Sequence, residues 1–203
     1  MKLFACIVIL VIVMGCVPKR LSKEEGERVP LCQALPVTLS RYQGVSSLQA
    51  QVLLKLGARD EYYLMRGLLL YERPARLRLR LTSTLGGTVG EVIYSDGLLY
   101  VLLPVEGKIF MGWIGGKNSQ KGGTIFLKLS YRNYEQIGRK RLPTRIYGEV
   151  EGKRIRFELR LKDLQIDLPL PEGVFSPTTG GWEVHPLEDL KDFISTPRAE
   201  EGP

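Results

Sequence analysis

Apolar and polar residues alternate with a period of two over most of the middle of the chain. Residues 76–82 read Arg-Leu-Arg-Leu-Arg-Leu-Thr, and residues 154–162 repeat the pattern with charged side chains at every second position. Such a period gives a segment one apolar and one polar face, as in a half-buried β-strand. The apolar positions change parity around residues 162–163, which predicts a β-bulge there.

Further segments of the same character predict more strands, and short turn sequences join several of them. The predicted strands cover residues 49–56, 61–72, 90–94, 98–103, 124–131 and 143–150. The turns at residues 57–60, 95–97 and 151–152 favour hairpins. Strands joined by tight turns pair with their neighbours in sequence, so an antiparallel meander of about nine or ten strands is expected.

A meander of this size must curl or close. Its concave side is expected to carry Leu, Ile, Val, Phe and Tyr, and its convex side Arg, Lys, Glu and Gln. A short helix is predicted around residues 38–43. The pattern leaves open whether the interior is filled by side chains of the strands, by a helix or by a ligand.

The chain begins with Lys2 and an apolar stretch over residues 3–15. This stretch is shorter than the roughly 20 residues that span a bilayer and is typical of a signal peptide. Residues 13–16, Val-Met-Gly-Cys, resemble the lipobox of bacterial lipoproteins. The resemblance implies cleavage after residue 15, a diacylglycerol on Cys16 and acylation of the new N-terminus. Several acyl chains hold a protein stably on a membrane.

Composition divides the rest of the chain into three parts. Residues 16–36 are charged, contain prolines and lack periodicity, so we expect a lipidated cysteine followed by a flexible tether. Residues 37–190 form the expected half-barrel domain, and residues 191–203 an expected disordered tail. Val17 stands where an aspartate usually retains lipoproteins at the inner membrane, so resemblance to that sorting rule implies the periplasmic face of the outer membrane.

Charge and chemistry narrow the function classes. The formal net charge of +7 falls to +6 when Lys2 is removed, and outside the inner membrane anionic lipids are the expected polyanions rather than nucleic acid. Of the three cysteines, only Cys32 is left over; it is either free, which we expect, or paired with another chain. His185 is the only histidine and lies in no Ser or Cys motif. We therefore expect no metal, no cofactor and no enzymatic activity.

Three segments in order resemble one known family. Residues 72–112 carry an alternating strand, the turn Leu-Thr-Ser-Thr-Leu-Gly-Gly and an acidic-glycine hairpin. Residues 142–167 place Leu-Pro before a long hairpin, and residues 168–187 form a proline-rich ending. With the lipobox, these segments resemble the outer-membrane lipoprotein localisation factors, the LolA/LolB-like family, most closely its lipid-anchored LolB-like branch. The resemblance implies an unclosed β-barrel around an apolar cavity for acyl chains, with lipoprotein or lipid as cargo and a periplasmic carrier protein as partner.

The resemblance also suggests which side chains serve this function. The interior set, expected either to line the cavity or simply to fill it, is Val52, Leu54, Leu68, Leu70, Leu77, Leu79, Leu81, Phe157 and Leu159. Leu85, at the tip of the turn over residues 81–87, is the candidate for contact with the membrane, with packing under the turn as the alternative. Trp113 is expected either at the membrane interface or packed in its loop. Two arginine rows are expected to face water or anionic headgroups: Arg76, Arg78, Arg80, Arg154, Arg156 and Arg160.

The chain departs from the family pattern in its centre. Between residues 112 and 124 it has only a short glycine-rich segment where the family has helices that cover the cavity mouth. Thr84 also stands where the family prefers proline. A smaller, shallower or unlidded barrel is expected. The alternative function is therefore a scaffolding lipoprotein of the envelope with a filled barrel.

Overall fold

The computed structural model describes residues 26–58, 61–114, 126–152, 154–178, 180–190 and 193. The predicted signal peptide, the lipidation site at Cys16 and the tail beyond residue 193 lie outside the described residues.

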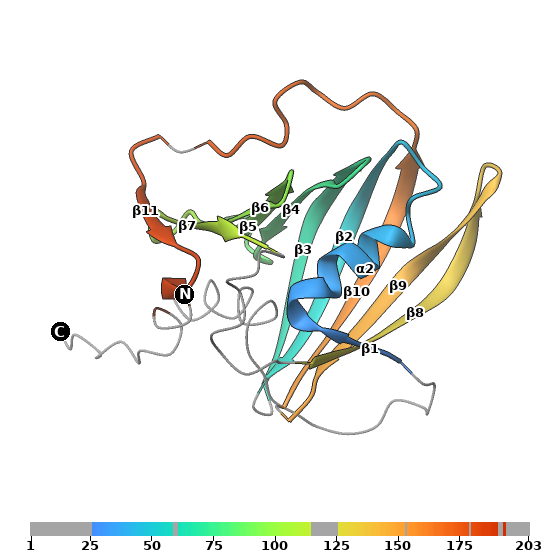
Figure 1. The fold of residues 1–203 in the computed structure, drawn as a ribbon, viewed down its shortest axis with the longest axis horizontal. Coiled ribbons are helices and arrows are strands. Elements are labelled where there is room, and N and C mark those ends of the chain that lie inside the picture. Colours follow the sequence, from blue (N-terminus) through green and yellow to red (C-terminus); the bar gives the residue numbers. More distant parts are fainter. Residues whose placement is uncertain are drawn as a thin grey trace.

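One eleven-stranded sheet forms the body of the molecule, in the order β1-β8-β9-β10-β2-β3-β4-β5-β6-β7-β11. Figure 1 shows this sheet with one helix, α2, against it. The elements are β1 (Glu27–Pro30), α2 (Leu31–Ser40), β2 (Ser47–Ala58), β3 (Glu61–Glu72), β4 (Arg76–Thr82), β5 (Thr88–Ser95), β6 (Leu98–Leu103), β7 (Lys108–Trp113), β8 (Phe126–Ile137), β9 (Lys140–Val150), β10 (Ile155–Ile166) and β11 (Glu183–Pro186).

The expected fold class is confirmed: the protein is mainly β, and its mostly antiparallel sheet curls without closing into a barrel. The pairing differs in one respect from a single meander in sequence order. Strands β2 to β7 form one meander and β8 to β10 another, and the two join where β10 pairs with β2. In that pair Leu159 lies opposite Leu54, so the apolar face continues across the join.

Two local predictions are confirmed. The register between β10 and β2 shifts between Lys162 and Gln165, and Asp163 has a φ of 51°. The bulge allows the apolar residues to change parity along β10. Between β5 and β6, Asp96 and Gly97 both have positive φ, the requirement of a tight two-residue hairpin turn.

The N-terminal helix begins earlier than predicted. It covers Leu31–Ser40 rather than residues 38–43, and it follows β1 directly, so residues 27–36 belong to the folded domain and not to the expected tether. The helix contains Pro36 and has no side-chain cap at its N-terminus. Because these local signals disfavour a helix, packing of its apolar residues against the sheet must stabilise it.

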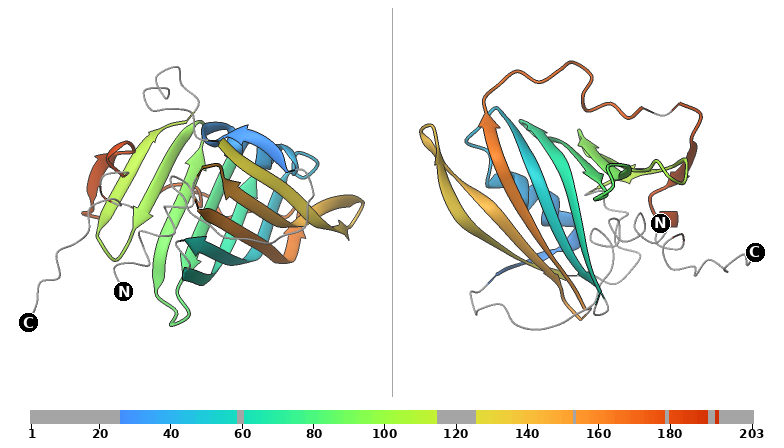
Figure 2. Two further views of the ribbon diagram at one scale, coloured as in Figure 1. Left: turned by 90° about the horizontal axis from the view of Figure 1, so that it is seen from below. Right: turned by 180° about the vertical axis from the view of Figure 1, so that it is seen from behind.

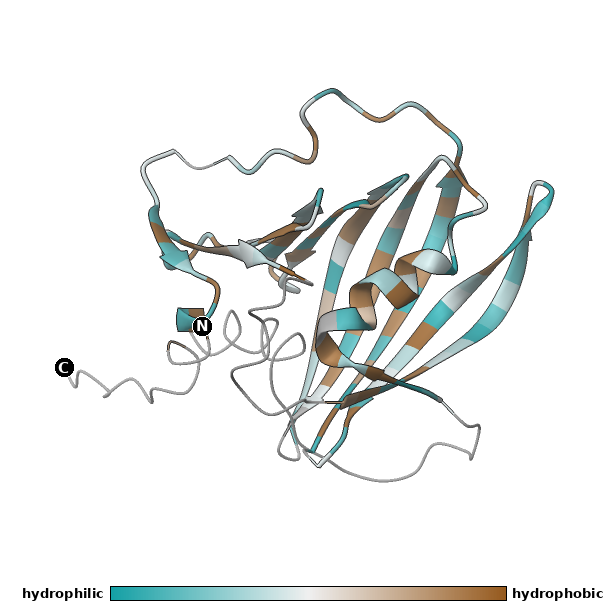
Figure 3. Cartoon of the chain, in the orientation of Figure 1, coloured by the Kyte–Doolittle hydropathy of each residue, from teal (hydrophilic) through white to brown (hydrophobic). Residues whose placement is uncertain are grey.

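The helix lies across the concave face of the sheet. From behind, the strands stand in front of α2 (Figure 2). Coloured by hydropathy, the strands show alternating bands and α2 carries apolar residues (Figure 3). The main core therefore lies between α2 and this face, and includes Tyr42, Leu48, Leu54 and Leu69.

The opposite face of the sheet is not uniformly polar, which corrects the expectation for the convex side. Leu70, Ile93, Leu102 and Ile109 form a second buried cluster there with Phe175. The segment between β10 and β11, of which residues 167–178 and 180–182 are described, supplies Phe175, and its described part arches across the top of the molecule (Figure 1). This segment, called the strap below, covers the outer surface of strands β3 to β7.

Candidate functional site: an apolar cavity beneath the helix

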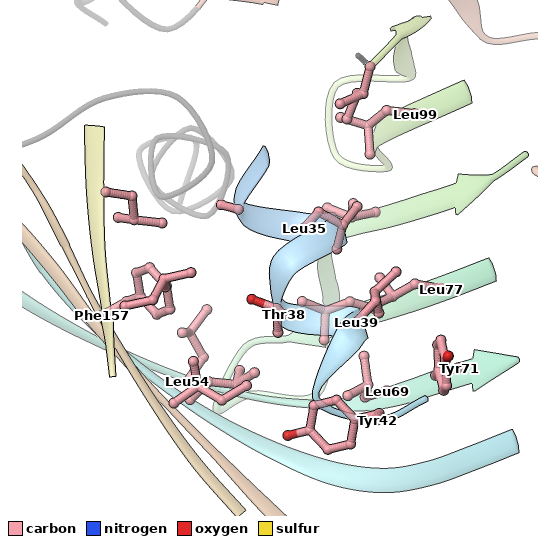
Figure 4. Close-up of a pocket in the computed structure, with 18 of the residues that line it drawn as sticks. Leu35, Thr38, Leu39, Tyr42, Leu54, Leu69, Tyr71, Leu77, Leu99 and Phe157 are labelled. Carbon is pink, nitrogen blue, oxygen red and sulfur yellow. The ribbon is translucent and has the colours of Figure 1, made fainter. Parts of the chain in front are cut away.

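A cavity of about 220 Å³ lies between α2 and the concave face of the sheet. Figure 4 shows its walls on both flanks of the helix, with Leu54 and Phe157 on one side and Leu77 and Leu99 on the other. The lining residues are Leu31, Ala34, Leu35, Thr38, Leu39, Tyr42, Leu48, Leu54, Leu69, Tyr71, Leu77, Leu79, Leu81, Val92, Leu99, Ile114, Leu127, Leu129, Ile146, Phe157 and Leu159. Apolar walls of this kind suit a hydrocarbon ligand.

Among the described residues that line the cavity, three side chains carry a polar group: Thr38, Tyr42 and Tyr71. The Thr38 hydroxyl is hydrogen-bonded to the hydroxyl of Tyr131 at 3.1 Å. The Tyr42 hydroxyl donates to the carbonyl oxygen of Pro143 at 2.8 Å, and burial raises the pKa of Tyr42. The Tyr71 hydroxyl is buried without a hydrogen-bond partner among the described residues.

The end of α2 is fastened to the sheet by these polar contacts. Besides the two hydroxyl contacts, the Arg41 guanidinium donates to the Glu27 carboxylate at 2.5 Å. Arg41 also lies over the ring of Tyr131, 5.1 Å from its centroid. The helix is thus a fixed wall of the cavity at its C-terminal end, and its N-terminal half is held by apolar contacts.

Six of the nine predicted lining residues surround the cavity: Leu54, Leu77, Leu79, Leu81, Phe157 and Leu159. Val52 lies on the same face of β2 and is buried in the main core, but it is not one of the lining residues.

Leu68 and Leu70 lie on the other face of the sheet, and their predicted position is corrected. The run Leu68-Leu69-Leu70 has no alternation of apolar and polar residues, so the sequence does not show which of these leucines face the concave side of the sheet. In the ladder between β3 and β4, Leu69 lies opposite Leu79, whereas Leu68 and Leu70 lie opposite Arg80 and Arg78. Leu70 therefore joins the cluster under the strap, and Leu68 is 38% exposed.

Sequence reasoning missed the part of the wall that α2 supplies. Leu31, Ala34, Leu35 and Thr38 fall in or near the segment expected to be a tether. The spacing of 31, 34 and 35, followed by 38 and 39, has a helical period and is the signal that identifies this face.

The turn between β4 and β5 exposes Leu85, whose side chain is 89% accessible. The alternative that Leu85 packs under the turn is therefore wrong. Trp113 is 70% exposed at the end of β7, and its ring lies beside Gly97. Because Trp113 pairs with Leu98 at the start of β6, it lies at the opposite end of β5 from Leu85.

Five arginines of the two predicted rows are paired with carboxylates. Arg78 is 11% exposed and Glu91 7%, and Arg78 Nε lies 2.6 Å from Glu91 Oε1. Arg80 also contacts Glu91, and Arg76 contacts Glu72 and Asp96. In the second row Arg156 contacts Glu149, and Arg160 contacts Glu158. The arrangement favours a structural role for these arginines over headgroup binding.

The described residues hold no group of three His, Cys, Asp or Glu side chains that could bind a metal ion. His185 stacks on Phe110 with the ring centroids 5.2 Å apart, and its Nε2 lies 3.3 Å from Glu183. Within the same part of the chain, no helix is long and apolar enough to cross a bilayer.

No family model and no curated protein matches the chain. Solved structures align with it at low identity. One is a LolA superfamily protein from Nitrosomonas europaea, 13% identical, with 70% of this chain and 97% of that one covered and a TM-score of 0.48.

Two others are a DUF1329 family protein from Desulfovibrio piger and an uncharacterized conserved protein from Thermus thermophilus, each 10% identical. Their alignments cover 71% and 76% of this chain and 95% and 99% of theirs, with TM-scores of 0.48 and 0.47.

Proposed function

We propose that this protein binds lipid or lipoprotein acyl chains in the cavity beneath α2. It does so at the periplasmic face of the outer membrane, anchored by lipid on Cys16, and assists outer-membrane lipoprotein localisation or envelope biogenesis. The observation that carries the proposal is the cavity itself, about 220 Å³ of space whose walls are almost entirely Leu, Ile, Val, Ala and Phe. The resemblance of residues 72–112 and 142–187 to lipoprotein localisation factors supports it.

The energetics suit transfer rather than permanent binding. Each CH₂ group moved from water into an apolar environment contributes about 0.8 kcal/mol. A bilayer offers the same gain, so an acyl chain passes between bilayer and cavity at little net cost. Such a balance lets a protein accept a chain and release it without covalent chemistry.

The cavity also supports ligand binding over the scaffold, the alternative function left open by the sequence. A scaffold with a filled barrel needs the concave face to be closed by side chains. Here α2 covers the face but leaves space between its underside and Leu79, Leu81 and Leu159. The cavity therefore favours ligand binding.

The test is mass spectrometry of an organic extract from the purified full chain. Fatty-acyl species in stoichiometric amount, in addition to the lipid covalently attached at Cys16, support the proposal. An extract with no such species, together with a co-purifying protein, would favour the scaffold.

Anchoring is tested separately. Cys16→Ala is expected to leave uncut precursor, because the lipid-modifying step precedes cleavage in proteins with a lipobox. Normal maturation and membrane retention of this variant would contradict the proposed anchor.

Leu85→Glu should mature normally but reduce binding of lipoprotein-loaded or plain vesicles, since a charge replaces the exposed leucine. Unchanged vesicle binding would remove Leu85 from the proposal.

A further inference from the structure

The cavity wall contains one polar group that is not satisfied. Tyr71 is 2% exposed, and its hydroxyl has no hydrogen-bond partner among the described residues. Leaving a buried hydroxyl unpaired costs about 1–3 kcal/mol. The other two polar lining residues differ, because Thr38 and Tyr42 are both hydrogen-bonded within the protein.

The surroundings of Tyr71 favour an acceptor with negative charge. Burial raises the pKa of this phenol, so it keeps its proton near neutral pH and acts as a donor. Arg73 is close enough for its charge to oppose that rise. Arg73 follows the end of β3, and its guanidinium donates to the carbonyl oxygen of Gln43 at 3.4 Å.

The size of the cavity limits the number of chains. A cavity of about 150 Å³ is known to bind benzene, a molecule of six carbons. In proportion, 220 Å³ holds a single acyl segment of roughly nine carbons. One chain fits this space, whereas the several chains of a lipoprotein would not enter together.

We propose that the occupant is a single-chain fatty acid, whose carboxylate oxygen accepts a hydrogen bond from the hydroxyl of Tyr71. The proposal rests on the proposed function and names the ligand class at the same site. The hydrocarbon chain lies along Leu69, Leu77 and Leu79, and the headgroup stands at the end of β3.

The experiment uses the mature full chain in nanodiscs and decanoate labelled with ¹³C at its carboxyl carbon, with empty nanodiscs as the blank. NMR titration gives both the affinity and the chemical shift of the bound carboxylate. Tyr71→Phe removes only the hydroxyl. Tyr42→Phe is the matched control, since its hydroxyl is also in the wall but donates to Pro143. Decyltrimethylammonium, used below its micelle concentration, carries the opposite charge on a chain of the same length.

Tyr71→Phe is expected to weaken decanoate binding about tenfold or more, the size of a hydrogen bond to a charged group, and to move the bound carboxyl resonance. Tyr42→Phe should change the affinity by less than about threefold. Equal affinity of wild type and Tyr71→Phe, or equal binding of decanoate and the ammonium probe, would overturn the headgroup assignment while the cavity remains a lipid site. If wild type binds neither probe, the proposed function itself fails.

Discussion

At the scale of single residues, Asp167 joins three parts of the sheet. Its carboxylate accepts hydrogen bonds from the Ser46 backbone N–H at 2.6 Å and from the Ser46 hydroxyl at 2.9 Å. Lys140 Nζ donates to the second oxygen at 3.0 Å. The bond from the Ser46 backbone, followed by that from Lys140, lowers the pKa of Asp167 to about 2. The contact fixes the end of β10 against the start of β2 and of β9.

This shift predicts a pH-dependent contribution to stability. Because the folded pKa is lower than the ordinary value, the charged carboxylate stabilises the fold above about pH 4, and the contribution is lost as the pH falls toward 2. Asp167→Asn removes the charge but tolerates the positive φ of 57°. The difference in unfolding free energy between wild type and Asp167→Asn, measured by urea denaturation, should be full above pH 4 and shrink toward pH 2. A difference independent of pH would show that the charge has no such role.

Residue by residue, the cavity wall could be predicted where the pattern alternates and not elsewhere. Leu77, Leu79 and Leu81 sit between arginines, so their common face is evident from the sequence. Leu68 and Leu70 sit in an unbroken apolar run whose inward face is decided only by pairing with β4. A strand buried on both faces carries no local signal of direction.

At the scale of elements, the strap depends on Arg78. Its guanidinium makes two bonds to Glu91, at 2.6 and 3.0 Å, and a third to the carbonyl oxygen of Val174 in the strap at 2.5 Å. Glu91 is 7% exposed, so it needs this partner.

Arg78→Ala is expected to lower the unfolding free energy by about 3 kcal/mol, because it leaves Glu91 buried and, among the described residues, paired with the half-exposed Arg80 alone. Arg156→Ala, which breaks the more exposed pair with Glu149, is the control and should cost less than about 1 kcal/mol. Chemical denaturation measures both. Similar losses in the two variants would mean that burial of the Arg78–Glu91 pair does not contribute as described.

Most strands could be predicted, some at their observed bounds, although β8 extends to Ile137 beyond its predicted end; β1, α2, β7 and β11 could not be predicted at their observed bounds. Residues 76–82 and 61–72 are predicted at their observed limits. The helix was predicted in part only, because Pro36 and the charged residues before it suggested a tether. The parallel pairing of β11 with β7 depends on the path of the strap, which no local pattern encodes.

At the scale of the whole molecule, a helix lies across the concave face of a curled sheet and a strap lies across its convex face, and an apolar cavity lies between the helix and the sheet. The sheet has β1 at one edge and β11 at the other. Both edge strands are only four residues long, which limits unwanted pairing of the sheet with other chains. The proposed lipid on Cys16 lies eleven residues before β1, so an extended tether would reach at most about 40 Å from the bilayer.

The central claim is that the space beneath α2 holds an acyl chain. Leu79→Trp fills the cavity, and Leu68→Trp adds the same side chain to the opposite face of the neighbouring strand. Acyl species released by organic extraction are quantified per protein for wild type and both variants. We predict an equal yield from wild type and Leu68→Trp and at least a fivefold lower yield from Leu79→Trp, corresponding to about 1 kcal/mol of lost binding. Equal yields from all three proteins, or none from wild type, would contradict the claim.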